Sequence, residues 1–159
     1  MIHHLSIEAE HPENVAQVLA EFMGGVCVPF PVHPGAFMAF ACDQHGTEVE
    51  VYPAGTLLVP GAEGTEFDRA PCAERTVSHF ALSVDMSKEQ VFKLAEKHGW
   101  RAQWVNRIES FPLVEVWIEN KTLVEVLVPE EAEIYLNVTR GIADRVSQGL
   151  DPMAKEQAE

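Results

Sequence analysis

The chain has 159 residues, of which 47% are hydrophobic and 23% charged, and its formal net charge at pH 7 is −14. This length and apolar content suffice for a sizeable core, in one domain or in two closely paired halves. The negative charge argues against nucleic acid and anionic membrane surfaces as partners. No run of about 18 apolar residues is present, so no membrane-spanning helix is predicted.

Cysteine usage and the N-terminal segment favour a cytoplasmic protein. The three cysteines are widely spaced and form no C-x-x-C pattern, which is typical of free thiols in a reducing compartment. The chain opens directly into a strand-like segment without a charged leader, so we expect no signal peptide.

The first half of the chain predicts a strand, a helix and three further strands. The first strand is expected at Ile2–Ala9, where apolar and polar residues alternate, and the helix at about Glu13–Met23, before Gly24 and Gly25. The later strands are expected at about Val26–Phe30, Ala36–Cys42 and Glu48–Pro53.

Alternation in the last of these strands separates an apolar face from a polar one. Val49 and Val51 point to one side, whereas Glu48, Glu50 and Tyr52 point to the other. We therefore expect a sheet with one apolar face beneath a helix and one more polar face.

The second half predicts the same order of elements after a long connection at residues 54–75. Ser87 and Gln90 form a capping-box pattern at the start of its helix, and Gly99 follows its end. Its strands are expected at about Val77–Val84, Gln103–Ile108, Leu113–Glu119 and Thr122–Val128. After Pro129, apolar residues recur every four positions and predict an amphipathic helix, followed by a polar tail from Asp151.

A His–Glu pair occurs twice at one fixed interval of 46 positions. His4 precedes Glu50 and His79 precedes Glu125, so both residues recur after 75 positions. Without any gap, the same offset also aligns identical residues, including Leu19 with Leu94, Gly24 with Gly99, and Val49 and Val51 with Val124 and Val126. Two copies of this length indicate a duplicated half-domain rather than a repeat array.

The predicted class is α+β, with two tandem βαβββ modules that form a cupped mixed sheet with helices on its convex face, plus a C-terminal helix. The expected divisions are a first module at 1–53, a linker at 54–75, a second module at 76–129, and a C-terminal helix and tail at 130–159. The alternation puts both His–Glu pairs on the helix-free face. Pairing of the modules, within one chain or by swapping between two chains, would bring the four side chains together.

Imidazole and carboxylate groups are ligands of first-row divalent metals, so His4, Glu50, His79 and Glu125 predict a site for Zn, Ni, Mn or Fe. Such an ion leaves positions for a substrate with two neighbouring oxygens and acts on it as a Lewis acid. Each of these residues alone is more simply explained as a polar group on a solvated sheet face. The symmetric arrangement of all four is better explained as a set of metal ligands.

This doubled unit resembles the vicinal oxygen chelate superfamily, which includes glyoxalase I, bleomycin resistance proteins and extradiol dioxygenases. The matching segments are His3-His4-Leu5-Ser6-Ile7, Val49-Glu50-Val51, His79-Phe80-Ala81-Leu82 and Val124-Glu125-Val126, within about residues 1–130. The resemblance implies metal ligands at His4, Glu50, His79 and Glu125, nearest in order to glyoxalase I, with Glu125 also acting as the catalytic base. Residues 1–66 contain no Lys or Arg, so glutathione dependence is not expected.

Further residues are candidates for the wall of a substrate pocket: Glu48, Tyr52, Phe37, Trp104 and Trp117. Packing in the core is an equal alternative for the aromatic residues. Glu48 is either an acid that supports a metal ligand or part of the rim, and we favour the rim.

The sequence thus predicts a glyoxalase-like, metal-dependent isomerase or lyase that acts on a small molecule and forms a homodimer. The alternative is a metal-free protein that binds and sequesters a small molecule, as in bleomycin resistance. A third possibility is an interaction module whose C-terminal helix binds a partner.

Overall fold

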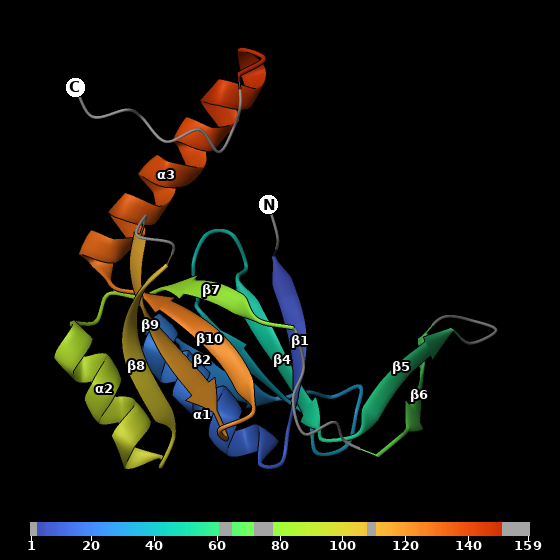
Figure 1. The fold of residues 1–159 in the computed structure, drawn as a ribbon. Coiled ribbons are helices and arrows are strands. Elements are labelled where there is room, and N and C mark those ends of the chain that lie inside the picture. The colour runs from blue at the N-terminus through green and yellow to red at the C-terminus, as the bar shows by residue number, and fades with distance from the viewer. Residues whose placement is uncertain (1–2, 61–64, 72–77, 108–110, 151–159) are drawn as a thin grey trace.

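The computed structural model describes residues 3–60, 65–71, 78–107 and 111–150. The first module comprises β1 (His4–Ala9), α1 (Pro12–Met23), β2 (Val26–Pro29), β3 (Phe37–Phe40) and β4 (Glu48–Pro53). The second comprises β7 (Phe80–Ser83), α2 (Lys88–Lys97), β8 (Arg101–Arg107), β9 (Phe111–Ile118) and β10 (Thr122–Leu127). A hairpin of β5 (Thr56–Pro60) and β6 (Thr65–Arg69) lies between them, and α3 (Pro129–Ser147) follows. The α+β class with a C-terminal helix is confirmed (Figure 1).

Several predicted boundaries cannot be compared with the structure. The expected strand starts at Ile2 and Val77, the strand end at Ile108 and the polar tail from Asp151 lie outside the described residues.

The two modules have the same sheet topology. The strand orders are β1-β4-β3-β2 and β7-β10-β9-β8, and the first strand of each module runs parallel to the last. Ser6 is paired with Glu50 in the first sheet, and Ala81 is paired with Glu125 in the second. The register of each parallel pair is therefore identical after the 75-residue offset, as expected of a duplicated unit.

Helix α1 is buried over a much wider arc than α2. At about 100° per residue, its buried side chains span about 200° of the helix circumference, whereas those of α2 span about 100°. The buried residues are Val15, Ala16, Val18, Leu19, Ala20 and Phe22 in α1, and Val91, Leu94 and Ala95 in α2. All of them belong to one core cluster with the buried valines of both sheets. An arc of this width indicates that α1 packs against two surfaces.

Both ends of α1 contact the second module. Just before its first turn, the backbone amides of Glu10 and His11 donate to the carboxylate of Glu119, at 2.6 and 2.8 Å. At its other end, Met23 lines a cavity together with Ser83, where β7 ends. Helix α1 therefore lies between the two sheets, packed along the first sheet and bordering the second module at both of its ends. The helix-free faces of the two sheets lie on opposite sides of α1.

The β5–β6 hairpin was not predicted within the connection at 54–75. It pairs Leu58 with Phe67 and projects from the rest of the molecule (Figure 1). Leu58 is 53% exposed and Phe67 is 38% exposed, and Leu57 is exposed as well. A two-stranded hairpin is only marginally stable by itself in water, so its apolar side chains would gain from a covering surface.

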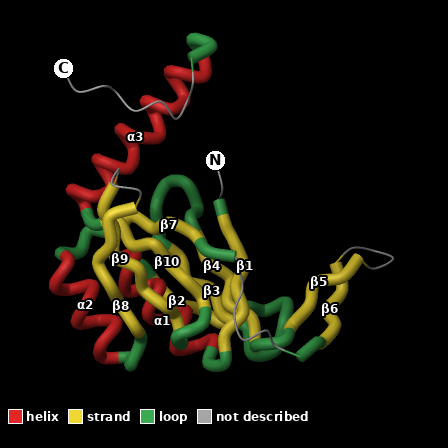
Figure 2. Tube along the Cα trace, viewed as in Figure 1, coloured by secondary structure: helices red, strands yellow, loops and turns green. Residues whose placement is uncertain are grey.

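The N-terminal part of helix α3 is anchored on the second module. Glu131 in its first turn is 3% exposed, accepts a hydrogen bond from Trp104 Nε1 at 3.0 Å and forms an ion pair with Lys88 Nζ at 3.0 Å. Tyr135 in the next turn packs on Phe111 of β9. The outer part of the helix extends away from both sheets (Figure 2), and α3 exposes Ile134, Leu136 and Val146. None of the described helices is long and apolar enough to cross a membrane.

A glycine at the end of α1 provides a test of the packing. A Cβ atom built at Gly25 would overlap the carbonyl oxygen of Phe40, so Gly25→Ala should lower the free energy of unfolding by about 3 kcal/mol. Gly141→Ala is the matched control, because a Cβ there meets nothing within 4 Å and alanine favours a helix by up to about 1 kcal/mol. Urea unfolding of both variants measures the difference. Equal stability would contradict the close contact.

Candidate metal-ligating site

Polar side chains gather on the helix-free face of the first sheet. In the parallel β1–β4 pair, His4 is opposite Glu48 and Ser6 is opposite Glu50. Because side chains alternate along a strand, all four point to the face away from α1. The structure thus brings the first predicted His–Glu pair onto neighbouring strands of one face.

Glu48 lies closer to His4 than the sequence suggested. Its Oε1 atom is 3.8 Å from His4 Nδ1, and its side chain is only 19% exposed. At this separation the Glu48 carboxylate is within ion-pair range of a protonated His4 but beyond hydrogen-bonding distance, so Glu48 faces His4 across the parallel strand pair.

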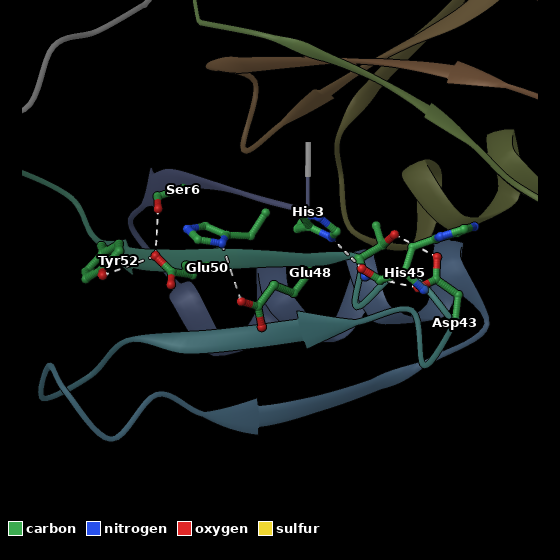
Figure 3. Close-up of polar contacts among 9 residues, drawn as sticks. His3, Ser6, Asp43, His45, Glu48, Glu50 and Tyr52 are labelled. Atoms are coloured by element: carbon green, nitrogen blue, oxygen red, sulfur yellow. Dashed lines mark hydrogen bonds and ion pairs between the residues drawn. The ribbon is translucent and has the colours of Figure 1, made fainter. Parts of the chain in front are cut away.

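The Glu50 carboxylate accepts two hydrogen bonds at one oxygen. Ser6 Oγ donates to Glu50 Oε2 at 2.7 Å, and the Tyr52 hydroxyl donates to the same oxygen at 3.3 Å (Figure 3). Sequence analysis did not single out Ser6. The available signal was its position two residues after His4, on the same face of the strand.

Tyr52 is well suited to remain a donor. Burial, and secondly the charge of Glu50, raise the pKa of Tyr52 to about 12, so its hydroxyl keeps its proton over the whole ordinary pH range. Its ring is held edge-on by Phe30 and His33, at centroid distances of 5.7 and 5.5 Å, and lies 5.8 Å from Phe67 of the hairpin.

A cavity of about 240 Å³ opens beside these hydroxyls. It is lined by β1, β4, the hairpin and the second module, through Ser6, Ile7, Glu8, Tyr52, Thr56, Leu58, Ser78 and Thr122. Hydroxyl groups and one carboxylate thus alternate with the apolar side chains of Ile7 and Leu58. The lining suits a small, partly polar molecule.

The second His–Glu pair occupies the equivalent place in the second sheet. His79 immediately precedes β7, and Glu125 on β10 is opposite Ala81 on one side and Glu115 on the other. Trp117 is opposite Leu123 and shares the face of Glu125.

Within one chain the two pairs do not form a common site. Among the residues that the structure describes, no group of three or more His, Cys, Asp or Glu side chains is placed to hold a metal ion. The position of α1 provides the physical reason, because it separates the sheets and directs their helix-free faces away from each other.

Two predicted pocket residues lie elsewhere. Phe37 is opposite Val51 and packs against the core, so it is on the α1 side of its sheet, and Met38 takes the place opposite Glu50. Trp104 is opposite Val114 on the helix side and contacts Glu131 and the Lys88 ammonium. The expectation for both residues is corrected: each side chain points to the helix side of its sheet, whereas a residue of the pocket wall would point to the helix-free side.

The β3–β4 turn holds β4 in register with its neighbours. Asp43 accepts hydrogen bonds from the Thr47 hydroxyl at 2.7 Å and from the backbone amides of Thr47 and His45. The hydroxyl bond is the largest cause that lowers the pKa of Asp43 to about 2. His3 Nδ1 lies 2.6 Å from the carbonyl oxygen of His45, which connects the turn to β1 (Figure 3).

Several solved structures share this architecture at low sequence identity. Lactoylglutathione lyase from Agrobacterium tumefaciens matches with a TM-score of 0.52 and 12% identity, over 81% of this chain and 93% of that protein. The chain has the glyoxalase-type fold. The fosfomycin resistance protein FosX from Mesorhizobium loti matches with a TM-score of 0.51 and 12% identity, over 79% and 88%. Trypanothione-dependent glyoxalase I from Leishmania major matches with a TM-score of 0.50 and 16% identity, over 94% of this chain and 97% of that protein.

The resemblance to the vicinal oxygen chelate superfamily is thus confirmed for the fold. No sequence-family model matches the chain, and no curated protein matches it significantly. At these sequence identities, a shared fold does not establish a shared reaction, which depends on the residues of the site.

The turn yields a pH-dependent prediction. Stabilisation from the depressed pKa of Asp43 should be fully present above its ordinary value of 3.8 and be lost as the pH falls towards 2. Removing the hydroxyl in Thr47→Ala should raise the Asp43 pKa towards 3.8, measured by NMR titration of the carboxyl carbon. Thr56→Ala, whose hydroxyl donates to Pro53 O, serves as control. An Asp43 midpoint unchanged by Thr47→Ala would contradict this explanation.

Proposed function

We propose that the chain is a glyoxalase-like, metal-dependent enzyme with isomerase or lyase chemistry on a small substrate with vicinal oxygens. One observation carries the proposal. Glu50 and Glu125 occupy the same register position on the last strand of two equivalent sheets, and His4 and His79 stand at the same offset before them.

The donor set suits a divalent first-row ion such as Zn, Ni, Mn or Fe. The contact between Glu48 and His4, and the hydrogen bonds to Glu50, are the kind of support that orients metal ligands in proteins. When bound, such an ion supplies a Lewis acid that polarises neighbouring substrate oxygens.

Since α1 separates the two pairs, the four ligands require two chains. His4 and Glu50 of one chain would meet His79 and Glu125 of a second copy in a homodimer. Exposed apolar side chains on the projecting hairpin and on α3 support such an association, because they remain uncovered in the single chain. Swapped pairing of equivalent modules is a common route to dimers.

Glu125 is the residue to which we assign proton transfer. A carboxylate beside the ion can accept a proton from a substrate carbon and return it to the neighbouring one. Glu50, held by two hydroxyl groups, is less free to move and is assigned to metal binding alone.

The substrate is proposed to be neutral or cationic. Residues 1–66 contain no Lys or Arg, and Glu8 lines the cavity next to Ser6 and Tyr52. An anionic glutathione conjugate would find no Lys or Arg side chain in this module.

Metal-free binding of a small molecule remains the second candidate. The observation in its favour is that the described residues of one chain place no three metal-ligating groups together. The cavity between β1, β4 and the hairpin would then be the binding site. Saturable binding that EDTA does not affect would support this function over the first.

Metal titration of the untagged protein tests the proposal. The wild-type chain should bind about one divalent ion per chain and gain thermal stability with Zn, Ni or Mn. His79→Ala should weaken binding by more than the roughly 10–100-fold that is typical of changes around a ligand. His11→Ala is the matched control, because the hydrogen bonds that the structure defines for His11, with Glu119 and with Val15, are made by its backbone. Wild-type protein that binds none of these ions and gains no stability would overturn the proposal.

A further inference from the structure

The carboxylate of the first module's His–Glu pair is held by two hydroxyl groups that have no counterpart at the equivalent sequence positions of the second module. The hydroxyl groups that hold Glu50 come from Ser6 and Tyr52. After the 75-residue offset, the same positions are Ala81 and Leu127, whose side chains cannot donate a hydrogen bond. The two halves are alike in backbone register and unlike in the surroundings of their carboxylates.

Both hydroxyl groups bind the same carboxylate oxygen. Ser6 and Tyr52 donate to Glu50 Oε2, at 2.7 and 3.3 Å, and no other hydrogen bond of Glu50 is seen among the described residues. Two donors at one oxygen fix the rotation of the carboxylate about its terminal bond. The other oxygen, Oε1, is thereby left available in a defined direction.

We propose that Ser6 and Tyr52 are positioning residues that present Glu50 Oε1 to the metal ion, so that the carboxylate of the first module is preorganised for metal binding. This inference rests on the proposed function, because it assumes that Glu50 binds a metal. The orientation is set before the ion arrives, so binding does not have to pay for ordering the carboxylate.

The surroundings of Tyr52 make its hydroxyl a rigid donor. The side chain is 7% exposed, and its ring packs against Phe30, His33 and Phe67. Phe67 belongs to the β5–β6 hairpin, so the hairpin helps to hold the donor that holds Glu50. Tyr52→Phe would keep this ring packing and remove the hydroxyl alone.

Metal affinity of purified, metal-stripped protein tests the inference without recourse to enzymatic activity. Competition of Zn with a chromophoric chelator should show dissociation constants about 10-fold higher for Ser6→Ala and for Tyr52→Phe, and higher again for the double variant. The number of ions bound per chain should not change. Ser6→Thr, which keeps a hydroxyl, should restore most of the affinity.

Controls separate positioning from a general effect on folding. Tyr135→Phe and Ser147→Ala remove a tyrosine and a serine hydroxyl group on α3. Tyr135 packs on Phe111, and Ser147 donates to the carbonyl oxygen of Asp144. Both variants should bind metal like the wild type. Melting temperatures of the metal-free proteins verify that all variants fold. If the wild type binds Zn and the two site variants bind it within about 2-fold, the positioning role is refuted while the metal site stands. If the wild type binds no Zn, Ni or Mn, the proposed function itself fails, and the inference fails with it.

Discussion

The position of α1 between two sheets is the constraint on which the rest of this structure depends. Its buried arc is about twice as wide as that of α2, which is what packing on two surfaces requires. Both ends of the helix contact the second module, through Glu119 at the start and near Ser83 at the end. The shared core therefore orders the two modules with their apolar faces inward and their polar faces outward.

This arrangement determines what one chain can do alone. Each sheet presents a His–Glu pair on its outer face, and α1 prevents the two pairs from meeting within the chain. A second copy resolves this, since the first module of one chain can face the second module of the other. The same association would cover the hairpin and the outer part of α3, both of which expose apolar side chains. In the proposed metal site, the half with Glu48, Ser6 and Tyr52 around His4 and Glu50 would then be ready before the partner supplies the remainder.

Local sequence patterns predicted the elements and the face of each first-module ligand, but not the arrangement of the sheets. Alternation correctly placed Glu50 beside Tyr52 and opposite the core, because the period of a strand is a local property. It gave the wrong face for Phe37, whose strand is apolar throughout, and for Trp104, although Arg101 and Gln103 mark the other face of that strand. The β5–β6 hairpin was missed because its strands lie in a connection rich in Gly, Pro and acidic residues, a composition typical of a loop. The role of α1 could not be predicted, since a wide apolar arc does not identify the second surface.

The most direct test of the central claim is metal binding by a heterodimer of two defective chains. One chain carries His4→Ala and the other His79→Ala, and two different affinity tags isolate the mixed dimer. If each site combines the first module of one chain with the second module of the other, one of the two sites regains all four ligands. The account predicts one ion of wild-type affinity per heterodimer, whereas either variant alone binds none tightly. A heterodimer that likewise binds no ion tightly would contradict a site shared between chains.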